Sequence, residues 1–231
     1  MEKSTFFGVS VGPGDPELLT LKALRVLEQC PVIATPRTKG GRTLALDIAR
    51  QVVDLTGKEI LPLSFTMSRD PAQLQAAHAQ AAAQVESHLA AGRHVAMLNL
   101  GDVSIYASFA YLADILAEKG YPVEMIPGVP SFCAVAARLG ESLTRWDQPL
   151  HILPATSPGW ESALNLPGTK VLMKSGKSIP SLQKALAERA EQPELPSASM
   201  VIDCGLPTEQ VFRHLIDAPS EPGYFATVLI K

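Results

Sequence analysis

The chain has 231 residues, of which 46% are hydrophobic and 19% are charged, and its formal net charge is -3 at pH 7. This size allows one large domain or two small ones, and we expect two. The slightly negative charge gives no global basic field, which argues against a nucleic-acid or membrane-surface partner. The N-terminus MEKSTFFGVSVG has an early acid and no long apolar run, so we predict a cytoplasmic protein without signal peptide or membrane span.

Three cysteines, Cys30, Cys133 and Cys204, form an odd set without CxxC spacing and lie among apolar residues. They are interpreted as small buried hydrophobic side chains in a reducing compartment. No pair of histidines has the spacing of metal ligands, so no protein-bound metal is predicted.

The first predicted strand, Thr5 to Val11, ends in the turn Gly12-Pro13-Gly14. Asp15 is a natural N-cap for a following helix, whose apolar face is formed by Leu18, Leu21, Leu24 and Leu27. The turn does not match GxGxxG, and its proline removes an amide donor. A phosphate-binding loop and a simple packing turn both remain open for this segment.

A second apolar run, Cys30 to Ala34, precedes the loop PRTKGGR, which carries Arg37, Lys39 and Arg42 without an acid. Its glycines allow it to fold over an anionic ligand, although solvated loops are often basic without such a role. The next elements are a helix from Thr43 to Val53 and a strand from Ile60 to Leu63.

A long alanine-rich helix follows, with Asp70 as N-cap, Pro71 in the first turn and Gly92 at the end. Its expected buried stripe comprises Leu74, Ala77, Ala81, Val85 and Leu89. His78 and His88 lie outside this stripe and are expected to be solvated.

The stretch VAMLNLGDVSIY predicts a buried strand, Val95 to Leu100, that stops at Gly101-Asp102. The helical face after it comprises Tyr106, Phe109, Leu112, Ala113 and Leu116. Another strand, Pro122 to Ile126, leads through PGVPS into a helix from Phe132 to Leu139 that Ser131 can cap.

Strands that alternate with helices predict a parallel α/β sheet. The turns at Gly12, Gly101 and Gly128 would then gather along one edge, beyond the carboxyl ends of their strands. Open α/β sheets bind ligands at this edge, where glycine allows close approach of the backbone. The sequence therefore predicts a ligand site there.

Polar residues from Glu141 to Pro149 indicate a domain boundary, which gives domains 1–143 and 144–231. Beyond the boundary, strands are predicted at Leu150 to Leu153, Lys170 to Met173, Ser199 to Asp203 and Tyr224 to Ile230. Helices are predicted at Ile179 to Ala190 and Glu209 to Ile216, and SPGWESALNLPG is expected to be a loop with at most one helical turn. The second domain is therefore predicted to be α/β with a mixed sheet.

Six segments, VGPGDPELLTLKALRVLE, LNLGDVSIY, PGVPSF, VLMKSG, DCGLPTEQ and YFATVLIK, have the order and approximate spacing of one family. The chain resembles the tetrapyrrole methylases, S-adenosylmethionine-dependent methyltransferases with two α/β domains around a central cleft. Within the family, FTMSRD, PRTKGGR and the length are similar to the precorrin-2 C20-methyltransferases of cobalamin biosynthesis, including those that act on cobalt-factor II.

The resemblance implies roles for particular residues. S-adenosylmethionine would contact Pro13, Gly101, Asp102, Ile105, Tyr106, Pro130, Ser131, Met173, Gly205, Ala226 and Thr227. The carboxylates of a tetrapyrrole substrate would bind to the basic side chains of Arg37, Lys39, Arg42 and Arg69. The family also implies a homodimer.

No spacing singles out a general base among Asp102, Tyr106 and His151, and the sequence does not decide whether the substrate already holds cobalt. Three alternatives remain open. The chain could methylate another tetrapyrrole position or the modified histidine of elongation factor 2. It could be a dinucleotide-binding oxidoreductase, although it lacks GxGxxG, or a non-catalytic cofactor sensor.

Overall fold

The structure, a computed structural model, describes residues 3–37, 43–66, 68, 70–188 and 197–231. The chain divides into two compact units, Met1–Pro130 and Ser131–Lys231. The boundary expected from the sequence lies later, after residue 143. Helix α5 (Ser131–Leu139) contacts strand β10 (Ala226–Ile230), and for this reason the residues just before 143 group with the second unit.

The first unit is a five-stranded sheet in which every strand pair is parallel. Its order is β3-β2-β4-β1-β5. The strands are β1 (Phe6–Ser10), β2 (Val32–Arg37), β3 (Glu59–Ser64), β4 (Val95–Asn99) and β5 (Val123–Ile126). The predicted parallel sheet is therefore confirmed.

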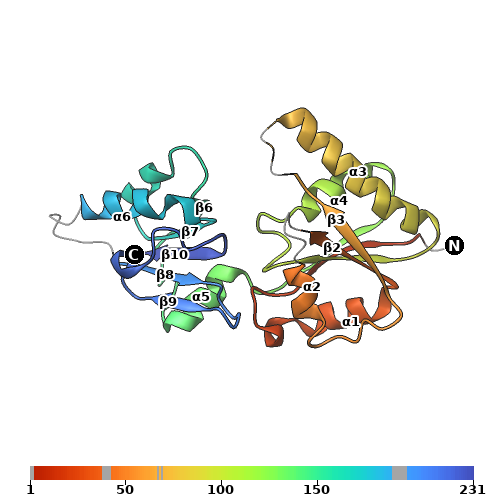
Figure 1. Cartoon of the computed structure of the whole chain (residues 1–231), viewed down its shortest axis with the longest axis horizontal. Helices are drawn as coiled ribbons and strands as arrows, with labels where there is room; N and C mark the ends of the chain where they lie inside the picture. Colours follow the sequence, from red (N-terminus) through yellow and green to blue (C-terminus); the bar gives the residue numbers. More distant parts are fainter. Residues whose placement is uncertain (1–2, 38–42, 67, 69, 189–196) are drawn as a thin grey trace. The chain divides into compact units, whose positions relative to one another are not determined.

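Helices cover both faces of this sheet, as Figure 1 shows. They are α1 (Leu21–Gln29) and α2 (Leu44–Ala49) on one face, and α3 (Pro71–Ala90) and α4 (Phe109–Glu118) on the other. Alternate β4 side chains enter the two cores, because Met97 packs with Phe109 while Leu98 packs with Leu27. A strand buried on both faces explains why the β4 sequence is continuously apolar.

The single helix expected from Asp15 is wrong. Asp15 does cap a turn, since its Oδ1 accepts from Glu17 N–H at 2.9 Å, but that turn is a 3-10 helix, η1 (Pro16–Leu18). Thr20 then caps α1 through its Oγ1, which accepts from Ala23 N–H at 3.1 Å. The second cap rotates the buried face, so Leu21 is 71% exposed.

Asp70 caps α3 as predicted, accepting from Ala72 N–H at 2.9 Å. The expectation that both α3 histidines are solvated is wrong. His88 lies 3.6 Å from a Glu59 carboxylate oxygen, and its side chain is only 15% exposed. His78 stacks on Tyr111 with ring centroids 4.3 Å apart, and partial burial lowers its pKa.

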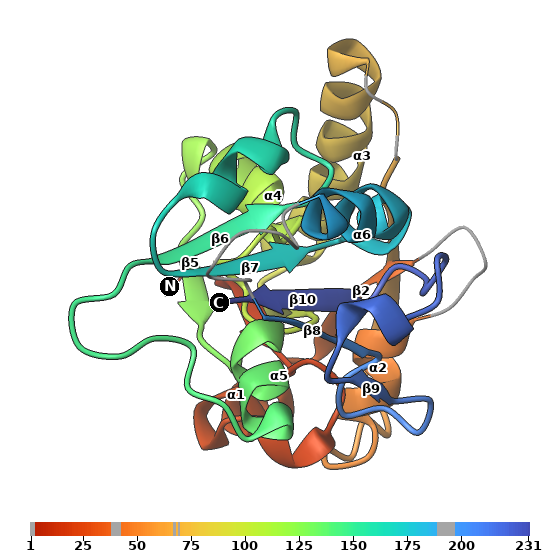
Figure 2. The ribbon, with the colours of Figure 1, turned by 90° about the vertical axis from the view of Figure 1, so that its left-hand side faces the viewer.

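The second unit is a mixed sheet with the order β6-β7-β10-β8-β9, and α5 and α6 lie on opposite sides of it (Figure 2). Only the β6–β7 pair is parallel, so the predicted mixed sheet is confirmed. The remaining elements are β6 (Leu150–Pro154), η2 (Trp160–Asn165), β7 (Thr169–Met173), η3 (Gly176–Ser178), α6 (Ile179–Ala187), β8 (Ala198–Ile202), β9 (Gln210–Phe212) and η4 (Leu215–Asp217).

The helix predicted from Glu209 to Ile216 is wrong. Residues 210–212 form β9, which pairs with β8 in the register Met200 to Phe212. Edge pairing in the sheet overrides the helical spacing of the apolar residues in this segment. Cys133 also differs from expectation because it is exposed, whereas Cys30 and Cys204 are buried. In the part of the chain that the structure describes, no helix is long and apolar enough to cross a bilayer.

Candidate functional site

The topology of the first unit singles out the carboxyl ends of β1 and β4. From β1 the chain moves to β2 and β3 on one side, and from β4 it moves to β5 on the other side. The strand order therefore reverses between β1 and β4. In open α/β sheets, ligands bind beyond the strand ends at such a switch point.

The glycine turns after these strands are bonded to each other. Gly101 N–H donates to the Gly12 carbonyl oxygen at 2.7 Å, and the two residues form an isolated β-bridge. Both have φ near +74°, at +74° for Gly12 and +73° for Gly101, a conformation that side chains disfavour. The sequence prediction that these turns gather at one edge is confirmed for this pair.

Gly128, after β5, joins the same cluster. A Cβ atom added there would lie 2.4 Å from Ser10 Cβ and 3.1 Å from the Gly101 carbonyl oxygen. No L side chain fits that space without a backbone shift. Three loops that are distant in sequence therefore pack into one rigid floor, which we call the glycine floor (Gly12, Gly101 and Gly128).

Asp102 bonds this floor together. Its Oδ1 accepts from the Ser104 N–H at 2.8 Å and from the Ser104 hydroxyl, and its Oδ2 accepts from Gly128 N–H at 2.7 Å. Burial to 7% exposure opposes ionisation, but these bonds outweigh it and hold the pKa of Asp102 below its usual value. Because both oxygens are engaged, this carboxylate holds the loops after β4 and β5 together.

The other candidate residues of the first unit surround this floor. Pro13 is buried, Pro130 is half-buried, and Ile105 is half-buried with its N–H bonded to the Asp102 carbonyl oxygen at 3.2 Å. Tyr106 was expected on the face of the next helix, but it precedes α4. Its φ of +51° is in the left-handed region and its side chain is 47% exposed. A left-handed residue ends the loop and turns this ring outward instead of into the core.

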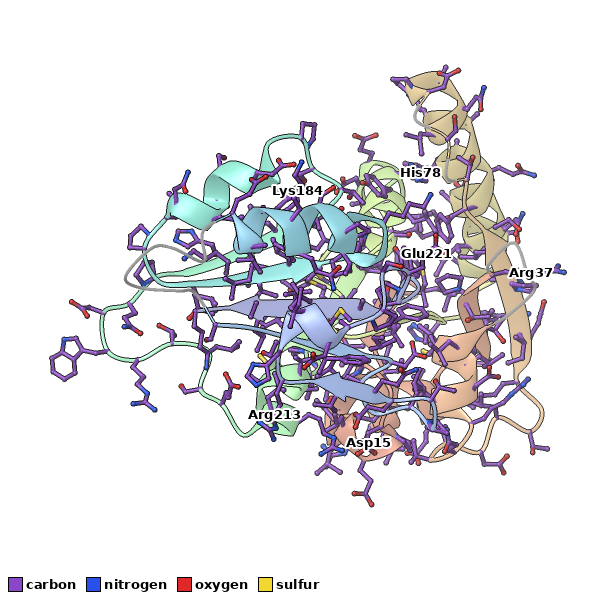
Figure 3. All side chains as sticks on the ribbon, turned by 60° about the vertical axis from the view of Figure 1, so that its left-hand side comes forward. Asp15, Arg37, His78, Lys184, Arg213 and Glu221 are labelled. Carbon is purple, nitrogen blue, oxygen red and sulfur yellow. The ribbon has the colours of Figure 1, made fainter. Side chains whose placement is uncertain are left out.

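The basic candidates are described only in part. Arg37 is exposed at the carboxyl end of β2, next to β4 in the sheet, and its side chain extends away from the ribbon (Figure 3). It therefore belongs to the same sheet edge as the glycine floor. Lys39, Arg42 and Arg69 lie outside the described residues.

In the second unit, the remaining candidates gather at the edge where β7 and β8 end and β10 begins. Val228 pairs with Leu172, so the next residues, Thr227 and Met173, are neighbours. Ala226 pairs with Ile202, the last residue of β8, and Gly205 lies in the turn that follows. Ser131, by contrast, is the first residue of α5 instead of its cap.

One hydrogen bond and one close backbone contact hold this edge in place. The Ser175 hydroxyl, fully buried, donates to the Ala226 carbonyl oxygen at 2.9 Å. A Cβ added to Gly176 would lie 1.9 Å from the Gly223 carbonyl oxygen, so the loops after β7 and before β10 are in close backbone contact. The loop after β7 thus fixes the start of β10.

Sequence reasoning missed four residues that build these edges: Ser10, Ser104, Ser175 and Glu209. Ser10 Oγ accepts from Val103 N–H at 2.8 Å and so supports the loop after β4. A usable signal existed only for Ser104, because an aspartate two residues earlier is the pattern of an Asx turn. Ser10 and Ser175 act across long sequence separations, and Glu209 joins nearby Gly205 to distant Arg138, so no local pattern reveals their roles.

The first unit is therefore a doubly wound α/β domain with a candidate ligand site at its switch point. A family model described as "Tetrapyrrole (Corrin/Porphyrin) Methylases" matches residues 5–219. The chain belongs to the tetrapyrrole methylase family.

Two relatives match nearly the whole chain. It is 34% identical to a cobalt-precorrin-2 C(20)-methyltransferase of Salmonella typhimurium, over 97% of this chain and 95% of the relative. It is 32% identical to a precorrin-2 C(20)-methyltransferase of a Sinorhizobium species, over 96% of this chain and 93% of that relative.

Solved structures share the fold. A cobalt precorrin-4 methyltransferase superposes with a TM-score of 0.76 at 21% identity, covering 98% of this chain and 94% of that one. A uroporphyrin-III C-methyltransferase from Thermus thermophilus superposes with a TM-score of 0.70 at 27% identity, covering 99% of this chain and 94% of that one. Another structure of a Thermus thermophilus enzyme of that name is a complex with S-adenosylhomocysteine, with a TM-score of 0.71 at 22% identity over 98% and 96%.

Proposed function

We propose that this protein is an S-adenosylmethionine-dependent methyltransferase that methylates C20 of a reduced tetrapyrrole, precorrin-2 or its cobalt form, in cobalamin biosynthesis. The observation that carries the proposal is the similarity, above 30% identity and through both units, to relatives named for this reaction. A uroporphyrinogen-III C-methyltransferase of Bacillus subtilis, named for a different methylation, is 28% identical over 82% of this chain, and a precorrin-4 C(11)-methyltransferase of Pseudomonas aeruginosa is 34% identical over only 61%.

The cofactor proposal is supported by the glycine floor. Gly12, Gly101 and Gly128 bring three loop backbones together at the switch point without a Cβ between them, which suits a ligand held largely by main-chain groups. The relative crystallised with S-adenosylhomocysteine has the same fold. The residues that would hold the cofactor are those implied by the family: Pro13, Gly101, Asp102, Ile105, Tyr106, Pro130, Ser131, Met173, Gly205, Ala226 and Thr227.

When bound, S-adenosylmethionine supplies a methyl group that is already a strong electrophile. The protein then contributes mainly orientation and exclusion of water, and orientation can lower a barrier by about 7–11 kcal/mol. A rigid floor suits this task, because Asp102 and Ser10 fix the loop after β4 from two directions. The bound cofactor would supply its methyl group to C20, the sulfur–methyl bond would break to leave S-adenosylhomocysteine, and a base would take the proton from C20.

Asp102 is a poor candidate for the base that takes this proton. Its two oxygens already accept three hydrogen bonds, and its lowered pKa makes it a weak base. Tyr106 and His151 remain candidates for this base. His151 Nε2 lies 3.0 Å from the Pro167 carbonyl oxygen. We assign no base among these two.

The substrate carries many carboxylates, and we propose that Arg37, Lys39, Arg42 and Arg69 bind them. Guanidinium groups bind carboxylates directionally, so the arginines among these residues would orient the macrocycle as well as attract it. We also propose a cytoplasmic homodimer, on the family resemblance. The Trp146 side chain is fully exposed in the single chain. A change of tryptophan fluorescence when the protein is diluted would therefore show that Trp146 is buried on association.

The test is an anaerobic assay with methyl-labelled S-adenosylmethionine, in which precorrin-2 and cobalt-factor II are offered separately. Mass spectrometry and NMR then locate the label. Label at C20 of either acceptor supports the proposal and decides the metal question. Label at another carbon, or transfer to neither acceptor by protein that binds S-adenosylhomocysteine, contradicts the C20 assignment and leaves the family unaffected.

A further inference from the structure

The loop after β8, residues 203–209, is tightly ordered although it contains an exposed glycine. Asp203 and Gly205 both have positive φ, at +51° and +81°. Leu206 N–H donates to the Asp203 carbonyl oxygen at 2.9 Å, and the Thr208 hydroxyl donates to the Asp203 carboxylate at 2.8 Å. These two bonds shape the turn but do not fix the Gly205 amide.

Glu209 fixes that amide. Its Oε2 accepts from Gly205 N–H at 2.9 Å, and its Oε1 accepts from the Arg138 guanidinium of α5. The buried thiol of Cys204 also bonds to this carboxylate, and burial raises the pKa of that thiol to about 11. One carboxylate thus joins the turn after β8 to helix α5.

The charge of Glu209 is maintained by the same contacts. Burial opposes ionisation of this side chain, which is 18% exposed, but the Arg138 guanidinium and the Gly205 N–H hold the pKa of Glu209 below its usual value. Both carboxylate oxygens are engaged within the protein. An effect of Glu209 on a ligand must therefore act through the turn that it holds.

We propose that Glu209, held by Arg138, is a positioning residue that sets the backbone of Gly205 for binding the cofactor. The inference rests on the proposed function, in which Gly205 contacts S-adenosylmethionine. Glu209 does not touch the cofactor; it fixes the plane of the peptide that does. A charged acceptor suits this role because bonds to a carboxylate are stronger than neutral ones.

The test compares Glu209→Gln with the matched control Glu188→Gln. Glutamine has the same shape but only one acceptor oxygen, so its NH2 group must face either Gly205 N–H or the Arg138 guanidinium. Glu188 is the C-cap residue of α6 in the same unit; its side chain is 64% exposed, and its Oε1 lies 3.9 Å from Lys184 Nζ. The control therefore removes an equal charge from an exposed side chain that holds no loop among the described residues.

Two readouts are measured. Calorimetry with S-adenosylhomocysteine should show a Kd about ten-fold higher for Glu209→Gln, the loss expected when a bond to a charged group is disturbed. Hydrogen exchange of the Gly205 amide should be about ten-fold faster without any ligand. The tetrapyrrole KM at saturating S-adenosylmethionine should be unchanged, and Glu188→Gln should match wild type throughout.

A Kd within two-fold of wild type for Glu209→Gln would overturn the inference, as would an unchanged exchange rate at Gly205. Wild-type protein that binds no S-adenosylhomocysteine would instead overturn the proposed cofactor, so the two failures are distinguishable. If Glu209→Gln does not fold, Arg138→Met takes its place. That variant keeps the Gly205 bond and should raise the Kd by a smaller factor, about three-fold, and no change there would count against the inference.

Discussion

Replacing Gly128 by alanine tests whether the glycine floor is as rigid as its geometry indicates. The new Cβ would lie 2.4 Å from Ser10 Cβ, an atom next to the backbone that cannot rotate away. Gly128 does not have a positive φ, so the added methyl group brings overlap without backbone strain. The loop after β5 must therefore move, and Gly128 N–H must leave the Asp102 carboxylate.

The expected cost combines these two effects. Overpacking a well-packed site costs about 1–3 kcal/mol. Disturbing a hydrogen bond to a buried carboxylate costs about 1.5–3 kcal/mol. We expect Gly128→Ala to lower the free energy of unfolding by about 2.5–6 kcal/mol and to abolish measurable binding of S-adenosylhomocysteine.

Urea unfolding can be followed by circular dichroism and by tryptophan fluorescence. Both tryptophans, Trp146 and Trp160, lie in the second unit, so the dichroism transition should shift while the fluorescence transition moves less. Gly92→Ala is the control in the first unit, because its φ is +78° but no atom lies within 4 Å of an added Cβ. Strain alone should cost it about 1–2 kcal/mol.

Adding Ser10→Gly to Gly128→Ala removes the overlapping atom and should recover part of the lost stability. The loss of unfolding free energy in the double variant should then be smaller than the sum of the losses in the two single variants. Gly128→Ala with wild-type stability and wild-type affinity would refute the reasoning, since the loop would then have room that the structure denies.

Four further predictions can be checked with the same measurements. Asp102→Asn should lower the free energy of unfolding by about 1.5–3 kcal/mol at pH 7. Because folding lowers the pKa of Asp102, its contribution to stability is present above the unfolded pKa of about 3.9 and is lost as the pH falls through the lower folded pKa. The stabilities of wild type and variant should therefore converge in acid. Ser175→Ala removes the hydroxyl that holds the Ala226 carbonyl and should cost about 1–3 kcal/mol in the fluorescence transition; an unshifted midpoint would contradict this. Arg37→Glu should raise the tetrapyrrole KM and leave the Kd for S-adenosylhomocysteine unchanged, whereas equal substrate affinity would remove Arg37 from the site. The Thr35 hydroxyl is fully buried and has no hydrogen-bond partner among the described residues, so Thr35→Val should leave the unfolding free energy unchanged or raise it by about 1 kcal/mol, and a large loss would reveal a partner.

The sequence by itself determined features that depend on neighbouring residues. Strand β4 follows from a continuous apolar run that ends at Gly101, and α3 begins where Asp70 and Pro71 predict, because caps and turns are local chemistry. The alternation of strands and helices likewise predicted a parallel sheet with glycine turns at one edge, and the family resemblance followed from six motifs spread along the chain.

Tertiary structure decided what depends on distant partners. Strand order placed the switch point between β1 and β4, and pairing with β8 made residues 210–212 a strand instead of a helix. The role of Asp102 changed for the same reason. Its sequence context allows a base or a ligand contact, but Gly128, 26 positions away, occupies its second oxygen. Hydrogen bonds and close packing across such separations leave no local pattern, and only the folded chain shows which groups they engage.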